Sequence, residues 1–487
     1  MTRLGDPTVV SVLLHVVIFG AVAVRVIMAR PSPGVALAWL LIVAVLPLAG
    51  LLLYLLFGER RIGGRRATRL ATLRPDLEDL TQVLVREGMA DVDWSTQPPL
   101  CRSMDQLGRS LVGVPTLTKN KLELHSDTLE MLRGIARDID AAEHSVHMEF
   151  YIWHAGGAAD EVLEAVMRAA QRGVTCRVLI DHLGARPWWN GDQPKRLQNA
   201  GVQVRPALRT GLLRTLTSRN DLRLHRKIVA IDGRIAWTGS MNLVDPRFFK
   251  QDAGVGQWVD AMVRVEGYAV VALGGTMLTD WQLETGENIH DLVRSAHLTR
   301  AAPAGEAEIQ VVPSGPQESG DAILQMIVAV TFAAKERLVL TTPYFIPDDS
   351  MKRALRGAAA RGVQVDLIVP ERVDSFFVRH ATRSYYEDLL DAGVNIQLFR
   401  GGLLHTKSIT ADDKISMIGT VNLDMRSLWL NYEVSLFVYD ADFTHRLRAL
   451  QETYLEDCIR VDPAAWSERP FPSQFADNTV RLISPLL

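Results

Sequence analysis

Two long apolar stretches occupy the N-terminus of the chain. Residues 9–29 are apolar except at three positions, and residues 35–57 contain no charged side chain. A helix rises 1.5 Å per residue, so either stretch would be about 30 Å long as a helix, roughly the thickness of the hydrocarbon core of a bilayer. We therefore expect a transmembrane hairpin over residues 1–60, with helices at about 9–29 and 35–57.

A cleaved signal peptide is the competing interpretation of the first stretch. It is disfavoured because no convincing small-x-small cleavage site follows Ala29, and because the second apolar stretch begins directly after the short segment Arg30-Pro-Ser-Pro-Gly34. Proline and glycine in this segment suit a tight turn between two membrane helices instead.

An arginine-rich segment follows the second apolar stretch, and residues 60–74 contain no acidic side chain. Its members are Arg60, Arg61, Arg65, Arg66, Arg69 and Arg74. Positively charged flanks of membrane helices stay on the cytoplasmic side, so we expect the rest of the chain to lie in the cytoplasm behind a multi-pass membrane anchor. The same charges could also attract anionic lipid headgroups, and the sequence leaves these two roles open.

The hydrophobic pattern of the remaining chain repeats. Residues 61–130 carry no such repeat, and we expect them to form a basic juxtamembrane connector. Beyond them, three kinds of segment occur twice in the same order: a helix end running into a strand, a helix closed by glycine before a β-branched strand, and a short Ala-Gly-Val strand start. The matched pairs are 141–152 with 333–346, 169–181 with 359–370, and 200–204 with 392–396.

This order of segments predicts the fold class. Helices that alternate with buried strands are typical of an α/β domain, in which a sheet lies between helical layers. Two such copies in one chain indicate an internal duplication. We therefore expect two similar α/β domains, the first at residues 131–300 and the second at residues 301–487.

Composition narrows the class of protein. The chain has 487 residues, of which 48% are hydrophobic, so packed domains rather than disorder are expected. The net charge of −3 argues against a strongly basic nucleic-acid-binding protein. Cys101, Cys176 and Cys458 are far apart and none belongs to a CxxC pair, which argues against a disulfide framework and against a thiolate zinc site.

The two copies share one motif that carries chemistry. In each copy a His-x-Lys triplet is followed by an aspartate and then by a Gly-Ser/Thr-x-Asn segment, with every matched position offset by 180 residues. The matched residues are His225, Lys227, Asp232, Ser240 and Asn242 in the first copy and His405, Lys407, Asp412, Thr420 and Asn422 in the second. With 12 His and 9 Lys in the chain, chance would give about 0.2 His-x-Lys triplets, so two complete copies indicate a function.

The spacing of this motif suits attack on a phosphate ester. Side chains at i and i+2 of a strand point to the same face, which places each histidine beside its lysine. An ammonium group can hold anionic oxygens while a neutral imidazole acts as nucleophile or general acid, and the later hydroxyl and amide add neutral donors. Two facing copies would surround one phosphodiester with positive charge, and this chemistry requires no metal.

These paired segments resemble the phospholipase D superfamily over about residues 130–487. More narrowly, the chain is similar to the bacterial cardiolipin synthases of the A type, through Gly239–Lys250, Thr342–Pro347, Asn422–Ser427 and the two N-terminal apolar stretches. The resemblance implies an α/β fold in which two tandem phospholipase D-like α/β/α domains form a pseudo-twofold unit, preceded by two transmembrane helices. It also implies a location in the bacterial inner membrane and no cofactor.

The resemblance further implies a covalent mechanism. One histidine forms a phosphatidyl-histidine intermediate, while the other protonates the departing glycerol and later activates the incoming alcohol. By similarity we expect His225 to be the nucleophile and His405 the acid and base, although the sequence itself is symmetric and leaves the reverse open. The residues expected to bind phosphate oxygens are Lys227, Lys407, Ser240, Asn242, Thr420 and Asn422. Asp232 and Asp412 belong to the motif but are expected to support the strands rather than to touch substrate.

Each imidazole also needs an acceptor for its second ring nitrogen. Glu433 follows His405 by 28 residues, at the place where the family carries such a carboxylate, and Asp260 is the matching candidate for the first half. We therefore expect Glu433 to orient His405 and Asp260 to orient His225.

Four functions remain open at this point. The first is a cardiolipin synthase that converts two phosphatidylglycerols into cardiolipin and glycerol by reversible phosphatidyl transfer. The second is a hydrolase that delivers water to the same intermediate, the third a nuclease, and the fourth a non-enzymatic membrane scaffold. The apolar N-terminus and the net charge oppose the nuclease, and two intact motifs oppose the scaffold. Phosphatidylglycerol, other phospholipids and the bilayer are therefore the expected partners, without nucleic acid.

Overall fold

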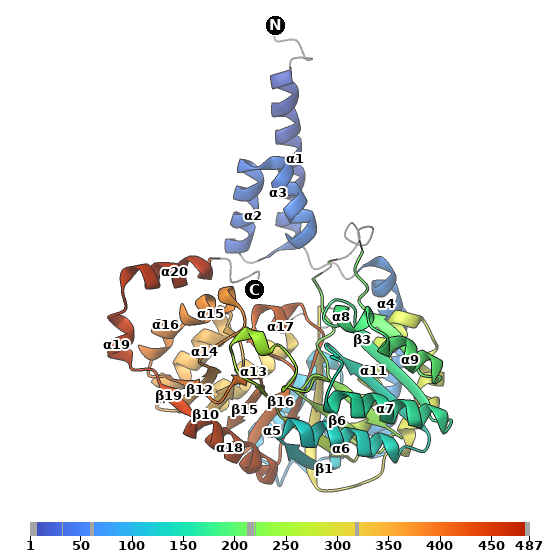
Figure 1. Cartoon of the computed structure of the whole chain (residues 1–487). Coiled ribbons are helices and arrows are strands. Elements are labelled where there is room, and N and C mark those ends of the chain that lie inside the picture. Colours follow the sequence, from blue (N-terminus) through green and yellow to red (C-terminus); the bar gives the residue numbers. More distant parts are fainter. Residues whose placement is uncertain are drawn as a thin grey trace. The chain divides into compact units, whose positions relative to one another are not determined.

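The computed structural model of the chain describes residues 7–31, 33–58, 63–211, 219, 221–316 and 321–482. The chain divides into two compact units. The smaller unit combines residues 1–68 with 210–221, and the larger unit combines residues 69–209 with 222–487. Figure 1 shows both units, with many of their elements labelled.

The smaller unit is built from apolar helices. Helix α1 (Pro7–Ala29) has 23 residues and is, among the described residues, the one helix that is long and apolar enough to cross a membrane. It is followed by α2 (Pro33–Val45), α3 (Pro47–Leu53) and the π-helix η1 (Tyr54–Gly58). The first of the two expected helices is thus present, but residues 35–57 do not form a second continuous helix.

The break in the second apolar stretch lies at Leu46 and Pro47. Leu46 leaves helical geometry, with a φ of −129° and a ψ of 74°, because a proline disfavours the helical conformation at the residue before it. Helix α3 then returns along α2: the ring centroids of Trp39 and Tyr54 are 5.4 Å apart, whereas a straight helix would separate these residues by about 22 Å. The second stretch is therefore a short helical hairpin, and α2 and α3 lie side by side in Figure 1.

Gly50 allows this hairpin to close. A Cβ atom at this position would lie only 2.8 Å from the Cα atom of Val43 on the facing helix. Any residue other than glycine would therefore push α3 away from α2. The expectation of two full membrane helices is replaced by one long helix and one short hairpin.

The arginine-rich segment behind the hairpin lies partly outside the described residues, which exclude Arg60 and Arg61. Its other members, Arg65, Arg66, Arg69 and Arg74, belong to helix α4 (Gly64–Arg86). Arg69 donates a hydrogen bond of 2.8 Å to the carbonyl of Leu283. This arginine therefore also serves the packing of the larger unit.

The larger unit is organised around one mixed β-sheet, which has 15 strands over the described residues. The strands of its first half are β1 (Leu117–His125), β2 (Ser145–Phe150), β3 (Thr175–Asp181), β4 (Gln203–Ala207), β5 (Ile228–Ile231), β6 (Ile235–Gly239) and β8 (Met262–Glu266). Those of its second half are β9 (Ala307–Ser314), β10 (Arg337–Thr341), β12 (Gln364–Pro370), β13 (Asn395–Phe399), β15 (Ser408–Ala411), β16 (Ile415–Gly419), β18 (Glu433–Val438) and β19 (Cys458–Arg460). The halves meet where β1 pairs with β9 in antiparallel orientation.

The order of strands outward from this central pair is the same on both sides. It runs β1-β8-β6-β5-β2-β3-β4 in one half and β9-β18-β16-β15-β10-β12-β13 in the other, where β19 adds an edge strand. This order confirms the predicted α/β class and the internal duplication. The predicted boundary between connector and first domain is wrong, because β1 begins at Leu117, within the expected connector, and belongs to the sheet of the first half, where it pairs with β9 at the junction of the two halves.

Helices cover both faces of the sheet. In the first half, α6 (Thr128–Asp140) and α7 (Ala158–Gln171) pack on one face and α11 (Ala269–Thr285) on the other. In the second half, α13 (Ala322–Ala333) and α14 (Asp349–Ala360) pack on one face and α18 (Ala441–Glu456) on the other. Helix α7 leads to β3 through Gly173, with a φ of 90°, and α14 leads to β12 through Gly362, with a φ of 88°. Both glycines have the positive φ that the repeat predicts.

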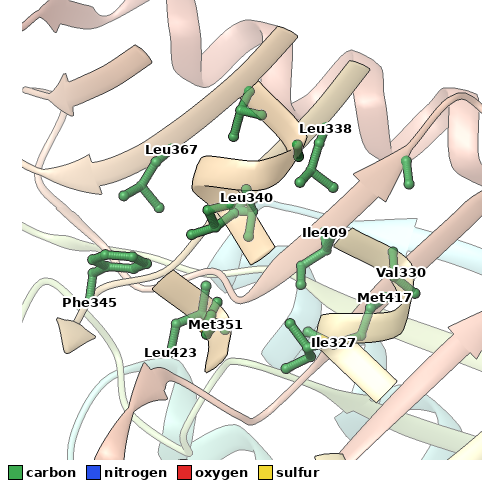
Figure 2. Packing of buried hydrophobic residues seen from close by; sticks show 14 of the residues in the cluster. Ile327, Val330, Leu338, Leu340, Phe345, Met351, Leu367, Ile409, Met417 and Leu423 are labelled. Atoms are coloured by element: carbon green, nitrogen blue, oxygen red, sulfur yellow. The ribbon is translucent and has the colours of Figure 1, made fainter. Parts of the chain in front are cut away.

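The core of the second half shows how these layers hold together. Ile327 and Val330 of α13 and Met351 of α14 share one cluster with Leu338 and Leu340 of β10, and each of these side chains is at most 2% exposed. Figure 2 shows them packed between the helices and the strands. Burial of one such side chain contributes about 1.5–3 kcal/mol. The layer therefore fixes β10 and its neighbour β15, the strand that directly follows the second His-x-Lys motif.

Candidate active site

Each His-x-Lys motif lies just before a central strand of its own half. His225 stands three residues before β5, and His405 stands three residues before β15. The backbone N–H of His225 donates to the carbonyl of Tyr432 at 2.9 Å, and that of His405 donates to the carbonyl of Val259 at 2.7 Å. Each motif is therefore hydrogen-bonded to the opposite half of the larger unit.

The carboxylates that orient the histidines also come from the opposite half. Nδ1 of His225 lies 2.7 and 2.9 Å from the two carboxylate oxygens of Glu433, and Nδ1 of His405 lies 2.7 Å from one oxygen of Asp260. We expected Glu433 to serve His405 and Asp260 to serve His225, and that pairing is wrong. The backbone hydrogen bonds between the halves end at Tyr432 and Val259, one residue before Glu433 and Asp260 respectively. They therefore place each carboxylate beside the histidine of the other half.

Ser240 and Thr420 hold these carboxylates in place. The Ser240 hydroxyl donates to Asp260 at 2.6 Å, and the Thr420 hydroxyl donates to Glu433 at 2.6 Å. Each hydroxyl also accepts a hydrogen bond from the backbone N–H that follows its carboxylate. The expectation that both hydroxyls bind phosphate is therefore wrong, because their single protons are used inside the protein.

Lys227 and Lys407 are buried, with at most 1% of their surface exposed. Each Nζ donates to the carbonyl of the histidine two residues earlier, at 2.6 Å and 2.5 Å. Burial lowers the pKa of Lys227 to about 8 and also lowers the pKa of Lys407. The charge of Lys407 acts on His225 and that of Lys227 acts on His405, so the two motifs form one electrostatic cluster.

Asn242 and Asn422 stay candidates for binding phosphate. Oδ1 of Asn242 accepts the backbone N–H of Ile152 at 3.2 Å, which fixes the amide and leaves its NH2 group as the donor. Asn422 is 6% exposed, and its Oδ1 has no hydrogen-bond partner among the described residues. Their role as phosphate ligands remains a prediction.

Asp232 and Asp412 stand at the far ends of the strands that follow the histidines. The carboxylate of Asp232 accepts hydrogen bonds of 2.7–2.8 Å from three consecutive backbone N–H groups, the last of which opens β2. In the same way, the carboxylate of Asp412 accepts hydrogen bonds of 2.7–2.9 Å from three backbone N–H groups, the last of which opens β10. The donors are Glu143, His144, Ser145, Lys335, Glu336 and Arg337. Both aspartates thus tie two strands together at the end away from the histidine, and their supporting role in catalysis stays a prediction.

Burial keeps both imidazoles neutral. It lowers the pKa of His225 and of His405 to about 4, against the attraction of the partner carboxylates and with the help of Lys227 and Lys407. A neutral ring that donates its Nδ1 proton to a carboxylate has a free lone pair at Nε2. In the free protein at pH 7, either histidine can therefore act as a nucleophile.

The same shift predicts that stability depends on pH. The unfolded chain takes up protons on these imidazoles below pH about 6.5, whereas the folded protein does so only near a pKa of about 4. Because the unfolded state binds more protons in this window, the folded state should lose on the order of 2 kcal/mol per ring between pH 6.5 and pH 5. Thermal unfolding of detergent-solubilised protein at several pH values measures this loss.

The matched control for this prediction is a double variant, His225→Gln with His405→Gln. Glutamine can still donate to the partner carboxylate but does not titrate, so the double variant should lose less stability than the wild type as the pH falls. Equal losses in the two proteins would show that the folded protein already binds protons at these rings above pH 5.

Two aromatic side chains beside the histidines were not expected from the sequence. The ring centroid of Tyr151 lies 5.1 Å from that of His225, and the centroid of Trp258 lies 4.3 Å from that of His405. Trp258 stands two residues before Asp260, so the alternation of a strand would have placed both on one face. Tyr151 directly follows β2 and carries no such signal.

The described residues contain no group of three or more His, Cys, Asp or Glu side chains that could hold a metal ion. What the structure brings together is a set of two histidines, two lysines and two carboxylates contributed by both halves. Such a set can bind an anionic phosphate, attack it and supply a proton. Fold and site together define a phospholipase D-like protein with one composite site per chain.

Family models and relatives narrow this class. A model described as "Cardiolipin synthase, PLD-like domain" matches residues 135–260 and 328–454, and a model described as "Phospholipase_D-nuclease N-terminal" matches residues 17–59. The chain is 43% identical over 490 residues to cardiolipin synthase A of Erwinia tasmaniensis, with 99% of both chains covered. It is 41% identical over 477 residues to cardiolipin synthase A of Yersinia pseudotuberculosis, with 98% of both chains covered. The chain therefore belongs to the cardiolipin synthase family.

A solved structure supports the fold. The crystal structure of phosphatidylserine synthase from Haemophilus influenzae Rd KW20 matches with a TM-score of 0.58 at 16% sequence identity. The match covers 79% of this chain and 100% of that chain. At this identity the similarity concerns the arrangement of the elements alone.

Proposed function

We propose that the protein is a cardiolipin synthase that moves a phosphatidyl group from one phosphatidylglycerol to another and releases glycerol. The observation that carries this proposal is the crossed pairing of His225 with Glu433 and of His405 with Asp260. It gathers two neutral imidazoles and two lysines in one buried cluster, which suits two successive displacements at one phosphorus atom. Membership of the cardiolipin synthase family supports the choice of substrate.

In the first displacement, Nε2 of one histidine attacks the phosphorus of a phosphatidylglycerol. The bond from phosphorus to the headgroup oxygen breaks, and the other histidine gives its Nε2 proton to that oxygen, so neutral glycerol leaves. The negative charge of the bound diester favours the protonated form of this second ring, although burial favours the neutral form in the free protein. Lys227 and Lys407 stabilise the charge that develops on the phosphate oxygens.

In the second displacement, the histidine that lost its proton takes one from a hydroxyl of a second phosphatidylglycerol. The hydroxyl oxygen then attacks phosphorus, the bond to the first histidine breaks, and cardiolipin leaves. Both histidines return to their starting states, so no other reactant is consumed. Because each step can run backwards, glycerol should convert cardiolipin back into phosphatidylglycerol.

We assign the nucleophile to His225 and the acid and base to His405. The support is a difference between the two carboxylates: Glu433 meets His225 with both oxygens and is held by two further side chains, whereas the second oxygen of Asp260 has no hydrogen-bond partner among the described residues. A fully held carboxylate fixes the ring orientation that attack requires. The oxygen of Asp260 that has no donor keeps its full negative charge, and Asp260 therefore stabilises the protonated ring of His405 better than a carboxylate with both oxygens hydrogen-bonded would. The family resemblance favours the same assignment.

We further propose that α1 crosses the inner membrane, whereas the hairpin from α2 to η1 enters and leaves the bilayer on one side. Helix α2 has 13 residues and is therefore about 20 Å long, too short for a hydrocarbon core of about 30 Å. The arginines of α4 favour the cytoplasmic side for the end of the hairpin and for the catalytic unit.

This arrangement predicts that residues 8 and 67 lie on opposite sides of the membrane. In a chain whose three native cysteines are replaced, a membrane-impermeant maleimide applied to intact cells should label Thr8→Cys but not Ala67→Cys. Permeabilised cells should allow both to be labelled, which serves as the control. If Thr8→Cys also needs permeabilisation, the second apolar stretch spans the bilayer as well.

The function itself is tested with purified protein and radiolabelled phosphatidylglycerol in mixed micelles. Cardiolipin and glycerol should form in equal amounts, and added glycerol should reverse the reaction. A protein that forms only phosphatidic acid, whatever the concentration of the second lipid, would be a hydrolase instead.

A further inference from the structure

A second polar cluster joins the two halves of the larger unit. Nζ of Lys250 lies 2.8 Å from one carboxylate oxygen of Asp374, and the hydroxyl of Tyr344 donates to the other oxygen at 2.9 Å. Lys250 comes from the first half, and Asp374 and Tyr344 come from the second. The side chain of Asp374 is 10% exposed and that of Lys250 is 46% exposed, so the cluster reaches solvent at one end.

This Lys250–Asp374–Tyr344 cluster adjoins His405. The Lys250 ammonium lies over the ring of Trp258, 5.7 Å from its centroid, and the Trp258 ring in turn lies 4.3 Å from that of His405. Burial alone would raise the pKa of Asp374, but its two hydrogen-bond partners and the charge of His405 lower it. Asp374 is therefore ionised and close enough to His405 for their charges to interact.

The groups of the cluster suit a ligand with several hydroxyls. An ionised carboxylate accepts hydrogen bonds from two hydroxyls at once, and an ammonium group donates to their oxygens. Burial, reinforced by Asp374, raises the pKa of Tyr344 well above its usual value, so its hydroxyl stays neutral and keeps donating to Asp374, which holds the carboxylate in place. This combination recognises a vicinal diol better than it recognises water.

The pseudo-twofold symmetry breaks at these residues. Trp258 stands two residues before Asp260, and the equivalent position before Glu433 is Asn431. Asn431 donates a hydrogen bond of 3.3 Å to Glu433, whereas Trp258 packs its ring on a histidine. The two histidines therefore have different neighbours.

Tyr344 lacks an equivalent in the first half. Leu423, which follows Asn422, pairs with Phe345, and Tyr344 stands directly before Phe345. Leu243, which follows Asn242, pairs with Trp153, and Ile152 stands directly before Trp153. The second half thus presents a phenol where the first presents an isoleucine. Two successive displacements at one phosphorus use two similar histidine sites. The substituents on the two sides of that phosphorus differ, because one is an acyl lipid and the other a polyol. We therefore relate the difference between the two halves to this difference in the substrate.

We propose that the Lys250–Asp374–Tyr344 cluster binds glycerol, both as it leaves the donor lipid and as the glyceryl headgroup of the acceptor. The proposal rests on the proposed function, in which His405 protonates the departing alcohol and deprotonates the arriving one. Asp374 accepts hydrogen bonds from the hydroxyls that do not react, and Lys250 donates to one of their oxygens. The reacting hydroxyl is thereby held toward His405, which gives a glyceryl alcohol an advantage over water.

The partition of one intermediate between glycerol and water tests this site. Full-length protein in detergent receives phosphatidyl-p-nitrophenol and increasing glycerol, and the ratio of phosphatidylglycerol to phosphatidic acid is measured. Both products arise from the same phosphatidyl-histidine, so their ratio does not depend on how much of a variant is folded. We expect Asp374→Asn and Tyr344→Phe to lower this ratio by about 10- to 100-fold, the effect of losing a hydrogen bond that involves a charged group.

The control is Glu306→Gln, which removes an exposed ion pair of 2.6 Å with Lys119 and should keep the wild-type ratio. A wild-type ratio in both Asp374→Asn and Tyr344→Phe would overturn the glycerol site alone. A wild-type protein that forms only phosphatidic acid would overturn the proposed function as well. If Lys250→Met weakens transfer to phosphatidylglycerol but not to glycerol, the lysine binds a phosphate and the polyol site is overturned.

Discussion

Alanine at either His225 or His405 should reduce cardiolipin formation by about ten-thousandfold or more. One ring must form the covalent intermediate and the other must move the proton, and both belong to a single cluster that the two halves share. Neither half therefore retains a complete site when one ring is lost. Initial rates with radiolabelled phosphatidylglycerol in mixed micelles measure the effect.

Two independent sites would behave differently, because each alanine variant would keep half of the wild-type activity. A mixture of the two variants should also remain inactive, since the crossed hydrogen bonds join two halves of the same chain. His290→Ala removes a half-exposed histidine that pairs with Asp76 and should retain the wild-type rate. Retention of substantial activity by either active-site variant would contradict the shared site.

Loss of either orienting carboxylate should reduce turnover by about 100- to 10,000-fold. In Glu433→Gln and Asp260→Asn, the neutral amide no longer stabilises a positively charged ring and no longer fixes which nitrogen carries the proton. The effect should be large because both carboxylates are buried at hydrogen-bond distance from Nδ1. Steady-state rates of cardiolipin formation give its size.

Pre-steady-state kinetics show which histidine each carboxylate serves. Phosphatidyl-p-nitrophenol loses its nitrophenolate without the help of an acid, so the burst reports on the nucleophile alone. Glu433→Gln should slow this burst, whereas Asp260→Asn should preserve the burst and slow the later turnover, because it acts through His405. The opposite result would mean that the acid and base is His225.

Much of the fold could be predicted from the sequence because its signals are local. A strand that follows a glycine-ended helix has the same pattern in both copies, and Gly173 and Gly362 adopt the left-handed conformation that this ending requires. β1 escaped prediction because most of its outward positions are polar and its partners β8 and β9 lie far along the chain. The pairing that places it at the junction of the two halves has no local signature.

The membrane segment shows a similar limit of local patterns. Hydropathy counts apolar residues but carries no information on the direction of the chain, so residues 35–57 satisfied the length of a membrane helix. Pro47 and Gly50 were the available signals, because one interrupts helical geometry and the other permits two helices to touch. Contacts in the folded chain, such as those of Trp39 with Tyr54 and of Gly50 with Val43, show that the chain folds back.

The residues of the site could be predicted, whereas the hydrogen-bond pairing between them could not. The offset of 180 residues identifies equivalent residues in the two halves, but it does not say which carboxylate reaches which histidine. That choice depends on backbone contacts between distant segments, such as the bond from His405 to Val259. Within the first half, the pairing of β6 with β8 brings Ser240 to Asp260, which turns an expected phosphate ligand into a support for the carboxylate.

The central claim is that both histidines act on one phosphorus atom and that His225 carries the lipid. A His405→Ala variant mixed with phosphatidyl-p-nitrophenol tests it most directly, because the intermediate can form but lacks the base that would discharge it. After denaturation with detergent at neutral pH, which preserves the bond between phosphorus and the imidazole nitrogen, we predict one nitrophenolate released per chain and a phosphatidyl group on the peptide that contains His225. A burst that leaves His225 unmodified, or lipid found on any other residue, would contradict the account.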